Sequence, residues 1–130
     1  MLPFTIEIKP GLPIAEQIQF AAKKAVVMGQ LRVGDKFPSV RQLSQELRVN
    51  PNTAHKVIAA LVAEGVLVTT PAVGSVVAPQ VNGNRRDRAE LLGPELERAI
   101  VEAKKLGLSL DDVESAIAAH WRRLSDPKKP

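Results

Sequence analysis

Polar side chains that can hydrogen-bond to base edges and phosphates gather between positions 39 and 56. Asn52 carries an amide that can form two hydrogen bonds with adenine, Thr53 can contact a thymine methyl group or a phosphate, and Lys56 can contact a phosphate or guanine. The remaining candidates of this group are Ser39, Arg41, Asn50 and His55. These residue types favour contact with a nucleic acid, provided that the chain places them on one surface.

A helix that begins at Asn50 is predicted to carry most of these side chains. Asn50 suits the N-cap, because its side-chain oxygen can accept from an unpaired amide in the first turn, and Pro51 suits the first helical position. The pattern then alternates between two faces: Ala54, Val57, Ile58 and Leu61 recur at helical spacing, with Asn52, His55, Lys56 and Ala59 opposite them. One face suits a core and the other a partner.

A second short helix is predicted just before this one. Ser39 is expected to cap it, with Gln42 three residues later as in a capping box. Arg48 and Val49 leave room only for a tight turn between the two helices. Two short amphipathic helices joined in this way form a helix-turn-helix, in which the second helix enters the major groove of DNA.

After Glu64 and Gly65 the pattern changes from helical to extended. Residues 66–70 and 75–78 are predicted to be strands around a turn at 71–74. A two-stranded hairpin directly after a helix-turn-helix is the wing of a winged helix. The predicted fold class is therefore mainly α with a small β wing (α+β), a winged helix-turn-helix domain followed by a two-helix C-terminal segment.

These residues and their spacing resemble the GntR family of bacterial transcription regulators, and the run Val49-Asn50-Pro51-Asn52-Thr53 is most similar to its short YtrA-type branch. The matching stretches cover roughly residues 4–79. They are PIAEQI at 13–18, LRVGDKFPSVRQL at 31–43, LVAEG at 61–65, and Gly74-Ser75. The resemblance implies a DNA-binding winged helix, and it assigns a DNA contact to Arg41, the arginine of Pro-Ser-Val-Arg.

Each candidate contact also has a simpler interpretation. Arg41 can be a solvated arginine on a helix surface, and Asn52 and Thr53 can serve capping and turn chemistry at a helix start. His55 can be an exposed histidine without a role. The wider family usually has Ser-Arg in place of Asn50-Pro51 and another arginine in place of His55, whereas the YtrA-type pattern itself carries Asn-Pro-Asn-Thr.

The predicted wing differs from the pattern of the resembling family. Residues 69–75 carry no charge, whereas arginines are common around the wing glycine of such proteins, so minor-groove contact by an inserted arginine is in question. Gly74 can let the backbone approach a phosphate, and Ser75 can donate to it. The alternative is a glycine required only by the backbone angles of the turn.

The composition fits a small intracellular protein with a polyanionic partner. The 130 residues carry a formal net charge of +4 and contain no cysteine, which excludes disulfides and cysteine metal sites. No apolar run approaches the roughly 18 residues of a membrane span, and the start lacks a signal-peptide pattern. The two histidines form no metal pattern, and no nucleophile motif or phosphate loop occurs. We therefore expect a cytoplasmic, non-enzymatic protein without cofactor or metal.

Further elements are predicted before and after the helix-turn-helix and its hairpin. Phe4–Ile8 alternates as a short strand does, and Pro13 is expected to open a helix that ends near Gly29. The expected organisation is a DNA-binding domain at 1–79, a linker at 80–88, a helical segment at 89–124 and a loose tail at 125–130.

The C-terminal segment is predicted to be a pair of helices for dimerisation. One runs from Asp87 to Lys105 with a kink or restart at Pro94, and the other begins at Ser109, which forms a capping box with Asp112. Their apolar stripe consists of Leu96, Ile100, Leu110, Val113, Ile117, Trp121 and Leu124. Two short helices cannot cover such a stripe alone, which favours a homodimer; packing back onto the chain's own winged domain is the alternative.

Two functions follow from these patterns. The first is a homodimeric transcription regulator that binds an inverted-repeat operator. The resemblance adds a repressor role, control of a transporter operon, and a small-molecule effector bound near His120 and Trp121 or at the dimer interface. The alternative is a winged helix used for protein–protein contact, which the uncharged wing favours.

Overall fold

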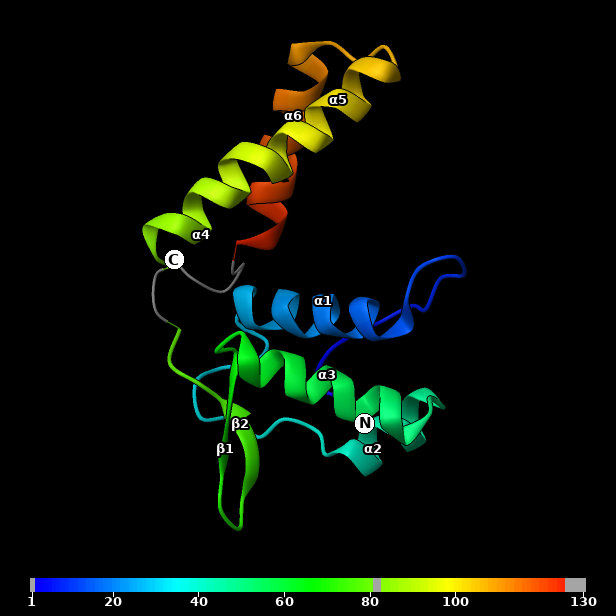
Figure 1. Cartoon of the computed structure of the whole chain (residues 1–130), viewed down its shortest axis with the longest axis vertical. Helices are drawn as coiled ribbons and strands as arrows, with labels where there is room; N and C mark the ends of the chain where they lie inside the picture. Colours follow the sequence, from blue (N-terminus) through cyan, green and yellow to red (C-terminus); the bar gives the residue numbers. More distant parts are fainter. Residues whose placement is uncertain (1, 81–82, 126–130) are drawn as a thin grey trace. The chain divides into compact units, whose positions relative to one another are not determined.

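The computed structural model describes residues 2–80 and 83–125, which form two compact units (Figure 1). The first unit ends at Gln80 and the second at Ser125. The tail expected at 125–130 therefore lies, apart from Ser125, outside the described residues.

The first unit contains three helices followed by a hairpin. Its elements are α1 (Ile14–Val27), α2 (Val40–Leu47), α3 (Pro51–Ala63), β1 (Leu67–Thr70) and β2 (Gly74–Val77). Helix α3 packs against both α1 and α2, and the hairpin follows it directly. This arrangement confirms the predicted fold class, mainly helical with a small β wing.

The core of the first unit lies between the three helices and the base of the hairpin. Ile18, Leu43, Val57 and Leu61 have no exposed surface. At one edge, the rings of Phe4 and Phe37 stack with their centroids 5.8 Å apart. Burial of these side chains fixes the positions of α2 and α3 relative to each other.

The wing is joined at its base to the loop that precedes α2. Within the hairpin, Leu67 pairs with Val77 and Thr70 with Gly74. The loop then adds an antiparallel bridge between Lys36 and Val76, and the N–H of Phe37 donates to the carbonyl of Ser75 at 2.9 Å. The backbone thus holds the wing beside the start of α2.

The strand predicted at Phe4–Ile8 is wrong. In the described part of the chain no strand pairs with this segment. Its alternation matches burial only in part: Phe4 is buried and Ile6 half-buried, whereas Thr5, Glu7 and also Ile8 are exposed. The next backbone groups bond to a side chain instead, because Gln17 both accepts from the N–H of Lys9 and donates to its carbonyl, each at 2.8 Å.

Two predicted helix starts also differ in detail. Pro13 is the N-cap of α1 and not its first residue. Ser39 does cap α2, accepting from the N–H of Gln42, but the second half of the expected capping box is absent. The Gln42 amide instead donates to Glu46 one turn later at 3.0 Å, so Ser39 alone caps the helix.

The second unit consists of helical segments. They are α4 (Arg85–Glu90), the π-helical η1 (Leu91–Glu95), α5 (Leu96–Lys105) and α6 (Leu110–Leu124). Helix α4 begins inside the stretch expected to be a linker, because the side chain of Asn84 caps it by accepting from the N–H of Asp87 at 2.8 Å. Around Pro94 the chain widens into a π-helical turn, since proline has no N–H to donate to the preceding turn.

Candidate nucleic-acid interface

The turn between α2 and α3 is fixed by a serine. The hydroxyl of Ser44 donates to the carbonyl of Val49 at 2.7 Å, and the N–H of Val49 donates back to the carbonyl of Ser44 at 3.1 Å. Arg48 lies between them in the left-handed region, with φ of 55°. This closed turn sets the angle at which α3 begins.

The N-cap predicted at the start of α3 is confirmed. The side-chain oxygen of Asn50 accepts from the N–H of Asn52 at 2.7 Å, and Pro51 is the first helical residue. The cap uses only the oxygen of Asn50 and the backbone of Asn52. The amide group of the Asn52 side chain therefore remains available to a partner.

The two faces of α3 separate as the sequence pattern indicates. Ala54, Val57 and Leu61 are buried completely, whereas Asn52, His55 and Lys56 are exposed on the other face. Thr53 is half-buried at the edge between them. The candidate side chains at 52, 55 and 56 thus share one surface.

The candidates on α2 come from its first turn. Ser39 and Arg41 are exposed, and the hydroxyl of Ser39 is already used in the cap. Within the described residues, the side chains of Arg41, His55 and Lys56 form no hydrogen bond or ion pair. Their charge and donors are therefore directed to solvent.

The wing contains two residues in the left-handed region, Ala72 with φ of 67° and Gly74 with φ of 96°. An added Cβ at Gly74 would meet no atom within 4 Å, so the glycine is required by its backbone angle and not by crowding. The hydroxyl of Thr70 donates to the carbonyl of Gly74 at 3.0 Å. Ser75 is half-buried, and its carbonyl holds the loop before α2.

The family model for bacterial regulatory proteins of the gntR family matches residues 14–77. Residues 14–77 are a helix-turn-helix domain of the GntR family. The matched stretch runs from α1 to the end of the wing. It therefore includes every DNA-binding candidate named above, since all of them lie within residues 39–75. The protein is accordingly a DNA-binding transcription regulator.

Relatives with known names support the YtrA-type resemblance. The chain is 28% identical over 113 residues to the HTH-type transcriptional repressor YtrA of Bacillus subtilis, covering 86% of this chain and 87% of that one. The uncharacterised HTH-type transcriptional regulator YhcF of the same organism is 29% identical over 106 residues, covering 82% and 84%. Both relatives are named as regulators, in agreement with the expected non-enzymatic role.

Solved structures agree with the fold. The crystal structure of a transcriptional antiterminator from Listeria monocytogenes EGD-e is 29% identical and matches with a TM-score of 0.84, covering 98% of this chain and 97% of that one. YtrA from Sulfolobus acidocaldarius, a GntR-family transcription factor, is 28% identical with a TM-score of 0.55, covering 92% and 97%.

The candidate interface contains one cation that the sequence patterns did not predict. Lys36 is exposed and borders a hollow of about 350 Å³ together with Ser39, Gln42 and Val73. No helical or strand period includes Lys36. Its bridge to Val76 and the hydrogen bonds between its neighbours and the hairpin place it beside the wing. Lys36 places a positive charge next to a hairpin that has none of its own.

Other kinds of site find little support in the structure. No group of three or more His, Cys, Asp or Glu side chains suited to a metal ion occurs within residues 2–80 and 83–125. Over the same ranges, none of the helices is long and apolar enough to cross a membrane.

Proposed function

We propose that this GntR-family regulator binds an inverted-repeat operator as a homodimer and acts as a repressor at chromosomal DNA in the cytoplasm. The observation that carries the proposal is the exposed face of α3, whose side chains at 52, 55 and 56 are without partners in the described structure. On the opposite face Ala54, Val57 and Leu61 are buried completely. The exposed face suits the floor of the major groove.

Base recognition is assigned to the first two turns of α3. Asn52 suits a bidentate contact with adenine, and Thr53 can reach a thymine methyl group or a phosphate from the edge of the helix. His55 and Lys56 follow on the exposed side, where Lys56 suits a phosphate or guanine. Asn50 has its oxygen in the cap, which leaves only its NH₂ group to donate to a phosphate.

Phosphate contacts are assigned to α2 and to the base of the wing. Arg41 and Ser39 lie in and before the first turn of α2, where side chain and helix N-terminus both favour an anion. Lys36 adds a charge beside them. Gly74 and Ser75 contribute backbone and hydroxyl donors, because the wing has no cation.

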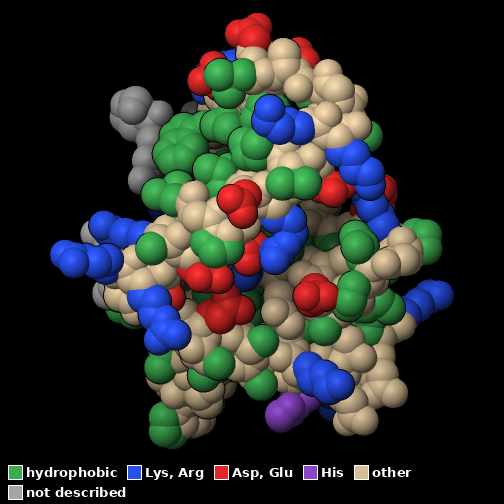
Figure 2. Space-filling model, turned by 45° about the horizontal axis from the view of Figure 1, so that its top comes forward, with side chains coloured by type: hydrophobic (Ala, Val, Ile, Leu, Met, Phe, Trp, Pro, Cys, Tyr) green, Lys and Arg blue, Asp and Glu red, His purple; other side chains and the backbone are tan. Residues whose placement is uncertain are grey.

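Dimerisation is assigned to the second unit, which cannot bury its own apolar side chains. In the described helices α4 to α6 no residue is buried. Ile100, Val113 and Leu124 are half-buried between the helices, whereas Leu96, Leu110, Ile117 and Trp121 remain exposed, the last by 76%. Figure 2 shows that hydrophobic side chains are exposed on the face of the molecule that it draws. A second copy would cover those of this unit.

The repressor role is supported by the similarity to YtrA of Bacillus subtilis, which is named as a repressor. Control of a transporter operon stays a prediction of the resemblance. The effector site expected beside His120 and Trp121 gains no support from the side chains, because a hollow of about 590 Å³ in this unit is lined instead by Leu92, Gly93, Pro94, Leu96, Glu97 and Ile100. His120 is hydrogen-bonded to Arg123 at 2.7 Å.

Selection from random duplex DNA tests the proposal. The purified protein is incubated with the library at near-physiological salt, bound DNA is sequenced, and the assembly state is measured by sedimentation. Enrichment of one inverted repeat by a dimer, with half-sites about 34–36 Å or a multiple apart, is the expected result. A monomer that enriches no sequence would contradict both parts of the proposal and would favour a protein–protein role for the winged helix.

A further inference from the structure

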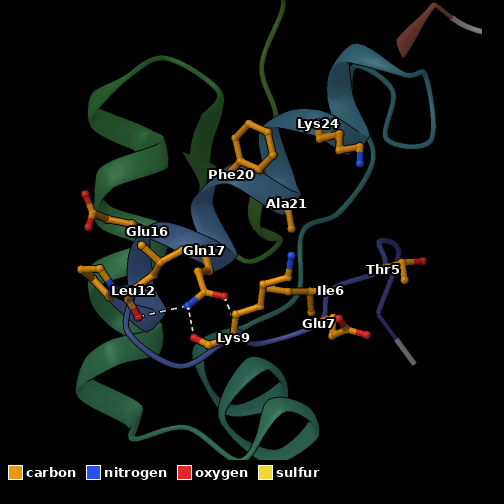
Figure 3. A pocket seen from close by; sticks show the side chains of 11 residues that line it. Thr5, Ile6, Glu7, Lys9, Leu12, Glu16, Gln17, Phe20, Ala21 and Lys24 are labelled. Atoms are coloured by element: carbon orange, nitrogen blue, oxygen red, sulfur yellow. Dashed lines mark hydrogen bonds between the residues drawn. The ribbon is translucent and has the colours of Figure 1, made fainter. Parts of the chain in front are cut away.

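A cavity of about 590 Å³ lies in the first unit between the segment before α1 and α1 itself (Figure 3). Its apolar wall is made by Ile6, Leu12, Phe20 and Ala21. Phe20 is 63% exposed and Leu12 59%. The other two phenylalanines of this unit, Phe4 and Phe37, are buried. The size falls within the range of about 300–1,000 Å³ that is usual for small-molecule sites.

The cavity is held open by one glutamine. The Gln17 amide donates to the carbonyls of Lys9 at 2.8 Å and Leu12 at 3.0 Å, and its oxygen accepts from the N–H of Lys9 at 2.8 Å. These three bonds fasten the turn from Lys9 to Leu12 over the start of α1, as the dashed lines of Figure 3 show. The wall that faces α1 is therefore preformed and does not need a ligand to order it.

The charges around the cavity favour an anion. In Figure 3 the ammonium groups of Lys9 and Lys24 lie on the side of α1 that carries Ala21, whereas the carboxylate of Glu16 points away from them. Neither lysine has a side-chain hydrogen bond or ion pair within the described residues. The neighbouring Lys23, by contrast, is paired with Glu64 at 3.0 Å.

We propose that this cavity binds a small organic anion with an apolar body, of the class of aliphatic and arylalkyl carboxylates. The apolar body would cover the rings and methyl groups of Phe20, Leu12 and Ile6, and the carboxylate would lie between Lys9 and Lys24. Two ammonium donors suit one carboxylate, because hydrogen bonds to charged groups are stronger than neutral ones. The proposal does not depend on the operator or on the dimer.

The test uses the full-length protein, labelled with ¹⁵N, without DNA. Octanoate and phenylacetate are the anionic probes, and 1-octanol is the neutral probe with the same apolar chain as octanoate. We expect saturable amide shifts centred on residues 5–24, and an affinity for octanoate about tenfold above that for octanol, since the alcohol lacks the charge that the lysines recognise.

The variants separate this site from general adsorption. The double variant K9Q/K24Q is expected to lose about tenfold in octanoate affinity, whereas K104Q, which neutralises an exposed lysine of α5, is expected to leave it unchanged. Circular dichroism confirms that each variant is folded. The proposal is overturned if octanol binds as tightly as octanoate, if K9Q/K24Q keeps the affinity, if the shifts centre on α5 and α6, or if neither anion saturates at millimolar concentration.

Discussion

Replacing Lys56 by alanine is expected to change the salt dependence of operator binding more than the stability of the protein. The side chain is exposed and has no partner within the described structure, so its loss should change the free energy of unfolding by no more than about 0.5 kcal/mol. If each Lys56 of a dimer contacts one phosphate, the slope of log K against log salt should fall in magnitude by about 1.8, since each contact contributes about 0.9.

That slope change has a measurable size. Between 50 and 200 mM salt, wild-type affinity should fall about twelvefold more than that of K56A, because a fourfold rise in salt is raised to a power of about 1.8. Fluorescence anisotropy with a labelled operator at several salt concentrations gives both slopes. K104A, in α5, is the control and should keep the wild-type slope. An unchanged slope for K56A, with an operator affinity equal to wild type, would remove Lys56 from the interface.

Three further predictions concern the elements around the interface. Ser44→Ala removes the hydroxyl that donates to Val49, and urea unfolding should show a loss of about 1 kcal/mol together with weaker operator binding, whereas Gln45→Ala, an exposed change in the same helix, should show neither. Ile117→Asp places a charge in the exposed apolar stripe, so sedimentation should show a monomer; a dimer as stable as wild type would exclude this stripe from the interface. The N–H and the hydroxyl of Ser109 lower the pKa of Asp112, so this carboxylate should stabilise α6 above its usual pKa of about 3.9 and cease to do so as the pH falls through the lowered value. NMR titration of the Asp112 carboxyl group checks the direction, and a value above 3.9 would refute it.

Local patterns predicted most of the helices because their causes are local. The N-cap at Asn50, the capping box of Ser109 and Asp112, and the buried stripe of α3 each depend on residues within a turn or two of one another. The alternation at Phe4–Ile8 was also read from neighbouring residues, and it matches burial at Phe4 and Ile6 but not at Ile8, which is exposed. It could not predict pairing, because a strand needs a second strand, and no partner for this segment occurs in the described sheet.

The sequence pattern predicted which side chains share the exposed face of α3, but it predicted the surroundings of α3 only in part. Asn52, His55 and Lys56 share an exposed face because helical spacing alone places them there. Lys36 was missed because its position depends on a bridge to Val76, forty residues later in the chain, which no local period encodes. Gln42 was expected to close a capping box, but a glutamine can equally reach a carboxylate one turn on, and it donates to Glu46.

The position of Lys36 gives a physical account of the uncharged wing. A wing that reaches DNA without cations must rely on backbone donors, and the hairpin already accepts strain to form its tip, since Ala72 lies in the left-handed region at a cost of about 1–2 kcal/mol. The bridge between Lys36 and Val76 binds the hairpin base to a loop that does carry charge. The wing and the loop before α2 are thus one backbone-paired unit. We propose that the hairpin supplies the shape of this unit and that Lys36 supplies its attraction to phosphate.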